Sequence, residues 1–419
     1  MDDASGGVTP VRSTRPLRGP LHDIRIVDFT ENMAGPFGTM ILADQGADVI
    51  KVESTTGDII RHTGSGSSEM ASYFANLNRS KRSIAINLHK PESAQVLEAL
   101  LDTADVVVHS FRPSATQRMG LVAQKVLLHR PKLIYVSIAG FGTTGPMAGR
   151  PVYDHVIQAL TGMADLQRSS DDDVPHLIRH GLIDKSTGYV LAESVCAALI
   201  ERYRTGVGTV LSISMLDVAI SLLWPDAMMD RTALEPEIRR PSAAQTFQLT
   251  QTLDGYVSLV VIKQTQWDGL VAALGIDLSF KGYHESDADT SSPGAVLRAA
   301  RKTIAGLPTD EVVERLSKFD VPCAPVNTLD QMISDGQVLA NETLIEYEHP
   351  LIGPIRQPRA TPRFSSMEGA PLLYAPGLGD QSREILAELG VSDITVDELI
   401  ASGTVRSGQT RMERNADGK

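Results

Sequence analysis

Short apolar strands that alternate with turns and helices constrain the fold of this 419-residue chain more than any other feature. A β-rich run at 24–29 is followed by a Gly-Pro turn, a helical stretch that ends near Ala43, and a second β-rich run at 48–53. A strand, a turn, a helix and a strand within about 30 residues are typical of a βαβ unit. The start of the chain is therefore predicted to build a parallel sheet covered by helices.

The same alternation continues along the chain as far as residue 145. Within it, further strands are predicted at 83–87, 105–109 and 133–138, and one more at 210–214 lies beyond it. A long helix is predicted at 184–204, where apolar residues recur at helical spacing, and the Gly-rich run 205–208 ends it. These patterns favour an open, doubly wound α/β layer.

The order of these elements also divides the chain into domains. We expect an α/β fold with a doubly wound, Rossmann-like large domain over 21–225 and a smaller α/β domain over 226–327. The loop-rich residues 328–405 are expected to return to the large domain. The polar ends are predicted to form a disordered tail over 1–20 and a flexible tail over 406–419.

Charge and cysteine content exclude several classes of protein. The chain has 39 basic and 51 acidic residues, a net charge of −12, and such a surface repels nucleic-acid backbones. Two cysteines, Cys196 and Cys323, exclude a disulfide framework, so free thiols in a reducing compartment are expected. No apolar run approaches the roughly 20 residues of a membrane span. With no signal-like start, the chain is expected to be cytoplasmic and to bind neither nucleic acid nor membrane.

Common cofactor and metal motifs do not fit the sequence. The turn after the first strand reads Ala34-Gly35-Pro36-Phe37-Gly38, without the spacing of a dinucleotide-binding fingerprint. A dehydrogenase on the same α/β layer is therefore disfavoured. His176 and His180 stand four residues apart, but no cysteine or carboxylate cluster accompanies them, so no metal site is expected.

Asp184 is the carboxylate with the most suggestive position, because it falls in the first turn of the helix predicted at 184–204. Aspartate in this position commonly caps a helix. The positive end of the helix also favours an ionised carboxylate, the state that a carboxylate nucleophile requires. Position alone leaves both roles open.

Several longer motifs carry a family resemblance. They are Asp28-Phe29-Thr30, Ala34-Gly35-Pro36, the run from Ala43 to Glu53, Asn78-Arg79-Ser80-Lys81-Arg82-Ser83-Ile84, Phe111-Arg112-Pro113, Gly140-Phe141-Gly142, Ser214-Met215-Leu216-Asp217 and Pro322-Cys323-Ala324-Pro325-Val326-Asn327. With them the chain resembles the class III CoA-transferase family, which includes the α-methylacyl-CoA racemases, from about Leu21 to Val405. The resemblance implies an interlocked homodimer that moves CoA from an acyl-CoA to a free carboxylic acid and holds no tightly bound cofactor.

The resemblance also implies catalytic residues. The aspartate of the family's Gly-x-x-Asp-x-x-x-Gly segment is the nucleophile, here Asp184, and Tyr153 and Asp154 would support it. Racemases have a histidine base at the position of Tyr153. Tyrosine has an ordinary pKa near 10 and is a poor base at neutral pH, and neighbouring His155 points about 100° away on a helix. The transferase is therefore favoured over a racemase, and a CoA-binding member without turnover stays a further alternative.

The resemblance also carries CoA contacts over to the turns after the predicted strands and to the helix that follows the fourth strand, which makes 21–225 a CoA-binding domain. The positions are Met33, Ala34, Ile86, Ser110, Phe111, Arg118 and Met119. Arginine at 118 would stack near the adenine and the phosphates, since its guanidinium is planar and permanently charged. The chain departs from formyl-transferring members at Met33 and at Ser54, which puts formyl-CoA/oxalate specificity and one phosphate contact in doubt. The sequence does not select the donor or acceptor acid.

Overall fold

The computed structural model describes residues 19–67, 69–168, 173–238, 247–277, 293–367 and 373–408. The chain divides into two compact units, one of Met1–Pro225 with Leu344–Lys419 and one of Asp226–Thr343. The smaller unit thus runs past the boundary that we predicted at residue 327. Most of the two predicted tails lies outside the described residues.

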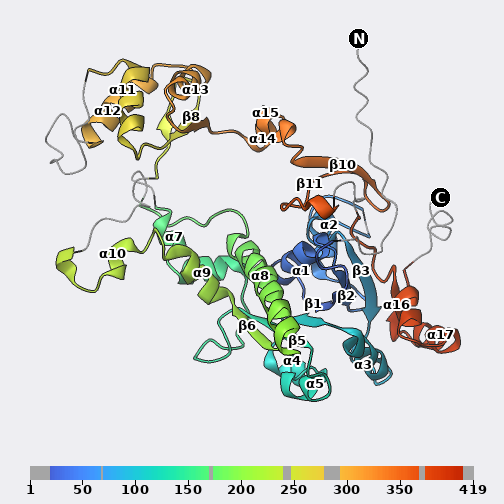
Figure 1. The fold of residues 1–419 in the computed structure, drawn as a ribbon. Helices are drawn as coiled ribbons and strands as arrows, with labels where there is room; N and C mark the ends of the chain where they lie inside the picture. The colour runs from blue at the N-terminus through green and yellow to red at the C-terminus, as the bar shows by residue number, and fades with distance from the viewer. Residues whose placement is uncertain are drawn as a thin grey trace, which may run out of the picture. The chain divides into compact units, whose positions relative to one another are not determined.

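A seven-stranded sheet forms the centre of the larger unit, with the strand order β12-β3-β2-β1-β4-β5-β6 (Figure 1). The strands are β1 (Arg25–Phe29), β2 (Asp48–Glu53), β3 (Lys81–Ile86), β4 (Val106–His109), β5 (Ile134–Ala139), β6 (Val210–Ser214) and β12 (Val405–Arg406). All neighbours pair in parallel except β12, which runs antiparallel to β3. A mixed α/β fold with a mainly parallel sheet is confirmed. The order reverses at β1, which lies between β2 and β4.

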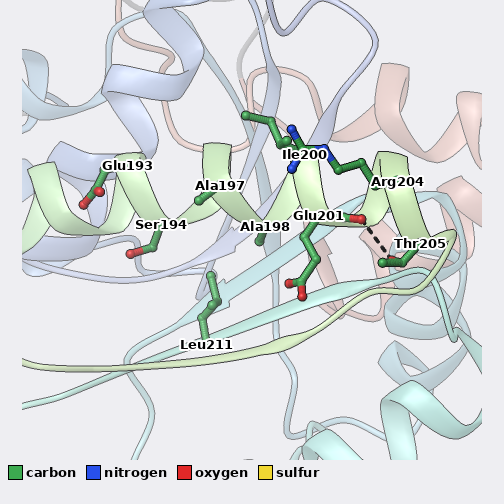
Figure 2. A pocket seen from close by; sticks show the side chains of 9 residues that line it. All are labelled: Glu193, Ser194, Ala197, Ala198, Ile200, Glu201, Arg204, Thr205 and Leu211. Atoms are coloured by element: carbon green, nitrogen blue, oxygen red, sulfur yellow. Dashed lines mark hydrogen bonds between the residues drawn. The ribbon is translucent and has the colours of Figure 1, made fainter.

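Helices connect and cover these strands. They are α1 (Ala34–Asp44), α2 (Ser72–Asn78), α3 (Ser93–Thr103), α4 (Pro113–Arg118), α5 (Ala123–His129), α6 (Asp154–Leu160), α7 (Met163–Leu166), α8 (Leu182–Thr205), α9 (Met215–Leu223), α16 (Ser382–Glu388) and α17 (Asp393–Ala401). The 24-residue α8 packs on α1 with its inner face. Its outer face, with Leu211 of β6, lines an open hollow of about 650 Å³ (Figure 2).

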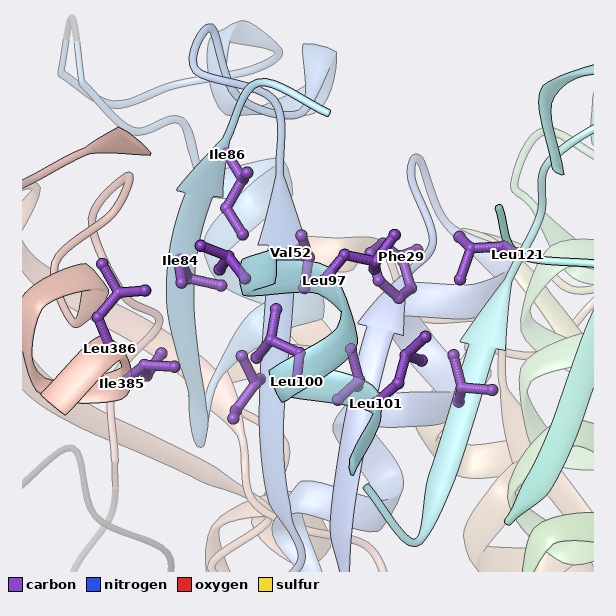
Figure 3. Packing of buried hydrophobic residues seen from close by; sticks show 14 of the residues in the cluster. Phe29, Val52, Ile84, Ile86, Leu97, Leu100, Leu101, Leu121, Ile385 and Leu386 are labelled. Atoms are coloured by element: carbon purple, nitrogen blue, oxygen red, sulfur yellow. The ribbon is translucent and has the colours of Figure 1, made fainter. Parts of the chain in front are cut away.

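Apolar side chains from alternate strand positions form a core on each face of the sheet. Val27 and Phe29 of β1 face a cluster that includes α3 and α16 (Figure 3). Their neighbour Ile26 belongs to a second cluster, which α1 and α8 cover. Successive residues of a strand point to opposite faces. Because both faces are covered, β4 reads as the unbroken apolar run Val106-Val107-Val108, typical of parallel sheets.

The returning segment is more regular than the loop that we predicted. It contains an antiparallel pair, β10 (Leu344–His349) with β11 (Gly353–Pro358), and then β12. The prediction of a flexible tail from residue 406 is wrong at its start, because Arg406 pairs with Ala85 of β3. Buried Val405 and the backbone pairing at the β3 edge hold this end of the chain.

The smaller unit has its own core. Its three strands, β7 (Thr250–Gln251), β8 (Tyr256–Leu259) and β9 (Cys323–Pro325), pair antiparallel. Its helices are α10 (Met229–Thr232), α11 (Gln264–Leu274), α12 (Pro293–Ile304), α13 (Thr309–Lys318), α14 (Leu329–Ile333) and α15 (Gly336–Ala340). Val257, Trp267 and Leu316 pack in one buried cluster between β8, α11 and α13.

Candidate active site

The close approach of α1 and α8 sets the position of Asp184. A Cβ atom added to Gly188 would lie 2.9 Å from the carbonyl oxygen of Ala34 and 2.9 Å from the amide nitrogen of Gly38. A Cβ atom on Gly38 would lie 2.7 Å from the carbonyl oxygen of Gly188. Only glycine fits two backbones this near one another. The contact brings the first turn of α8, and with it Asp184, beside the start of α1.

Asp184 occupies the third residue of α8, which confirms its predicted place in the first turn. It is not the helix cap, because Gly181 holds that position and no side chain caps the helix there. Instead, the backbone N–H of Asp184 donates a 2.9 Å hydrogen bond to Oδ2 of Asp154. The Asp184 side chain is half-buried and is not used for capping.

Asp154 opens α6, and its side chain is buried at 2% exposure. Its Oδ1 accepts a short hydrogen bond from Nε2 of Gln158, one turn further along the same helix. The preceding Tyr153 is 65% exposed. The structure therefore brings Asp154 to Asp184, whereas the Tyr153 ring is largely in solvent.

The surroundings of Asp184 raise its pKa to about 6, against an ordinary value of 3.8. Burial is the main cause, and the negative charge of Asp154 adds to it. The positive charges of His155 and Lys185 act in the opposite direction. The helix N-terminus alone predicts a lowered pKa for Asp184. That prediction is wrong in direction, because the structure raises this pKa. At pH 7 to 8 the carboxylate is still mostly ionised, and its raised basicity strengthens it as a nucleophile.

Tyr73 of α2 is a residue that the sequence analysis missed. Burial raises the pKa of its hydroxyl, and the carboxylates of Asp184, Asp58 and Asp154 raise it further. Its ring packs against the same apolar cluster as Met33. No periodic pattern marks Tyr73, since its proximity to Asp184 is tertiary. Gln158 could have been found, because a glutamine four residues after an aspartate on a helix is a common hydrogen-bonded pair.

The predicted CoA contacts of the first turn adjoin Asp184. Met33 occupies the position before the first residue of α1, and its Sδ lies 2.7 Å from the place where a Cβ of Gly181 would stand. Ala34 is the first residue of α1. This turn follows β1, at the carboxyl edge of the sheet where the strand order reverses. Ligands of open α/β sheets bind at this kind of switch point.

The contacts predicted after β4 lie at the same edge, on the other side of the switch point. Ser110 is exposed, and Arg118, also exposed, ends α4. Phe111 and Met119 pack on the core cluster of Figure 3, and the Phe111 ring stacks on His109 with centroids 5.7 Å apart. Burial lowers the pKa of His109 to about 4, so this imidazole is neutral.

Ile86, the remaining predicted contact, has its side chain in the core and pairs with Val405. Only its backbone can therefore contact a ligand.

The two hollows on α8 lie away from Asp184: the one in Figure 2, and one of about 280 Å³ lined by α1, α8 and residues 360–362. Within the described ranges, no group of three His, Cys, Asp or Glu side chains is arranged to hold a metal ion.

Comparison with known proteins shows which family this chain belongs to. The model of CoA-transferase family III matches residues 21–382. The chain belongs to this family. It is 30% identical to the succinyl-CoA:glutarate CoA-transferase of Mus musculus, over 94% of this chain and 92% of the mouse protein. It is therefore a class III CoA-transferase, an enzyme that works between acyl-CoA and carboxylic acids and uses CoA thioesters as substrates.

Solved structures resemble the transferase over most of its length. Protein Rv3272 of Mycobacterium tuberculosis superposes with a TM-score of 0.75 at 28% identity, over 89% of this chain and all of the other. A CaiB/BaiF family protein from Brucella suis gives 0.73 at 29% identity, over 88% and 99%. None of the helices in the described part of the transferase has the length and apolar character that a membrane crossing requires.

Proposed function

We propose that the transferase exchanges CoA through covalent intermediates on Asp184. A carboxylate oxygen of Asp184 attacks the thioester carbonyl of the donor, the C–S bond breaks, and a mixed anhydride and CoA thiolate form. The thiolate attacks the aspartyl carbonyl and releases the donor acid, which leaves an aspartyl-CoA thioester. The acceptor carboxylate then attacks this thioester, and the released thiolate attacks the acyl carbonyl of the new anhydride. Acyl-CoA leaves and the free Asp184 carboxylate returns.

The observation that carries this proposal is the setting of Asp184. Its carboxylate belongs to the first turn of α8, beside the Met33 turn that follows β1, and has a pKa near 6. It is thus ionised at neutral pH and more basic than an ordinary aspartate. Covalent catalysis replaces one difficult exchange by steps of similar energy. The seven predicted CoA contacts stay part of the proposal.

For the substrates we propose a succinyl-CoA donor and a dicarboxylic acid acceptor, which the name of the mouse relative suggests. Lys185 acts on Asp184 as a positive charge and suits the second carboxylate of such an acid. We also propose the interlocked homodimer that the resemblance implies. Light scattering on the purified chain tests the homodimer.

The mechanism is tested by trapping the intermediate. The protein is incubated with a panel of acyl-CoA thioesters, and its intact mass is measured with and without hydroxylamine, which cleaves thioesters and anhydrides. We expect a CoA or acyl adduct that both Asp184→Ala and Asp184→Asn abolish, because neither side chain can form the anhydride. Glu193→Gln, on the exposed side of α8, is the matched control and should keep the adduct.

Other outcomes separate the alternatives. Deuterium exchange at the α-carbon without CoA reaching an acceptor would identify a racemase. Binding of CoA without any acyl exchange would identify a module without turnover. A peptide map that finds the label on a residue other than Asp184 would contradict the mechanism.

A further inference from the structure

We infer that Gln158 is a positioning residue of this enzyme: through Asp154 it holds the first turn of α8 and so aims the Asp184 carboxylate. The inference rests on the proposed role of Asp184 as nucleophile. Neither Gln158 nor its partners would touch the reacting atoms in this role. Their contribution is the fixed direction of α8 where it enters the site.

The amide of Gln158 joins α6 to the segment that leads into α8. The residue is 0% exposed, and its Oε1 accepts a 2.9 Å hydrogen bond from the backbone N–H of Ile178. Its Nε2 lies 3.3 Å from the carbonyl oxygen of Ile178 and 3.4 Å from that of His180. His180 immediately precedes Gly181, the cap of α8. One buried side chain therefore holds the segment from Ile178 to His180, which leads directly into this helix.

The same amide orients Asp154. Nε2 of Gln158 donates to Oδ1 of Asp154, and Oδ2 accepts the backbone N–H of Asp184. The first N–H groups of a helix have no partner within it, so Asp154 takes the place of a capping side chain. A buried carboxylate requires donors to offset its lost hydration. With Oδ1 occupied by the amide, Oδ2 is held towards Asp184.

The chemistry of this arrangement requires an amide at residue 158. Methionine has a similar length but offers neither the donor nor the acceptor. Glutamate keeps the acceptor and places an oxygen against Oδ1 of Asp154. Two carboxylates at that separation do not both ionise, so a protonated glutamic acid would donate as the amide does. Gln158→Glu should therefore restore the contact at low pH and lose it as pH rises.

The test compares Gln158→Met and Gln158→Glu with the parent enzyme, as kcat, KM and the rate of adduct formation on Asp184. For the methionine variant we expect kcat to fall by about tenfold, which corresponds to about 1.4 kcal/mol of barrier, with KM for acyl-CoA changed less than about twofold. For the glutamate variant we compare its kcat with that of the parent at each pH. This ratio should be about fivefold higher at pH 6 than at pH 8.5. A structural role alone would not give this pH-dependent rescue.

Gln357→Met is the matched control. Gln357 is also a buried glutamine, bound to Tyr347 and Asn76 and far in sequence from α6 and α8. Its loss should lower the melting temperature as the loss of Gln158 does, but leave kcat unchanged. The inference is overturned if Gln158→Met keeps kcat within about twofold of the parent, or if the glutamate ratio is flat with pH. If Gln158→Met does not fold, the pH dependence of kcat in Gln158→Glu, relative to the parent, tests the inference by itself.

The two proposals fail differently. If Gln158 has no positioning role, the adduct on Asp184 still forms in the parent enzyme and disappears in Asp184→Asn. If Asp184 is not the nucleophile, that adduct is absent from the parent enzyme itself.

Discussion

Replacement of Asp184 by asparagine is expected to stabilise the larger unit at neutral and alkaline pH. The folded protein raises the pKa of this carboxyl from 3.8 to about 6, through burial and the charge of Asp154. Ionisation is thus less favourable in the folded chain than in the unfolded one. A displacement of the pKa by about two corresponds to roughly 3 kcal/mol. The side chain is half-buried, so screening by solvent reduces the expected gain to about 1–3 kcal/mol.

The pH range of the effect follows from the direction of the shift. Below pH 3.8 the carboxyl is protonated in both the folded and the unfolded state, and its ionisation does not affect stability. As pH rises from 3.8 through about 6, the unfolded chain ionises more readily than the folded one, and stability is lost. The asparagine variant carries no titrating group at this position. Its advantage over the parent should therefore be about a third of its full size at pH 4.5 and complete above pH 7.

The assay is thermal unfolding of both proteins at pH 4.5 and pH 8, without substrate. A unit of this size gains about 2–4 °C per kcal/mol, so Asp184→Asn should melt a few degrees above the parent at pH 8 and above it by about a third of that difference at pH 4.5. Glu193→Gln, on the exposed side of the same helix, is the control. It also removes a negative charge, but its melting temperature relative to the parent should be the same at pH 4.5 and pH 8. Equal melting differences at the two pH values, or a less stable asparagine variant at pH 8, would refute the electrostatic account of the site.

Three further expectations follow from the same contacts. With the ionised carboxylate as nucleophile, kcat should rise as pH increases through about 6, and in Asp154→Asn this limb of the pH–rate profile should move to lower pH. Arg82→Met should destabilise the larger unit by about 1–3 kcal/mol in urea unfolding, because the 3%-exposed arginine side chain pairs with Asp48, Glu384 and Glu388, of which Arg25 still pairs with Asp48 and Glu388. Gly188→Ala should cost about 1–3 kcal/mol in the same assay and slow adduct formation, since its Cβ would meet the carbonyl of Ala34 at 2.9 Å.

The strands of the sheet could be predicted because their own residues carry the signal. Buried runs such as Val106-Val107-Val108 stand between turns, and each is long enough to show its character without its neighbours. The two-residue β12 shows no such pattern. Its residues are a strand only because the edge of β3 is there to pair with them, and Val405 has a place in the core. Pairing across more than 300 residues leaves no local trace.

The candidate site also has features that the sequence could predict and features that depend on tertiary contacts. The first turn of α8 could be predicted from helical spacing, and the resemblance assigned its aspartate as a nucleophile. The pKa of Asp184 could not be predicted, because the helix N-terminus was considered alone. Burial in the folded chain opposes it most, and the negative charge of Asp154 adds to this effect. Asp154 lies on another helix and accepts the 2.9 Å hydrogen bond from the backbone N–H of Asp184. The carboxylate that steadies the helix is thus also one of the groups that make Asp184 more basic, so any change at Asp154 should alter position and reactivity together.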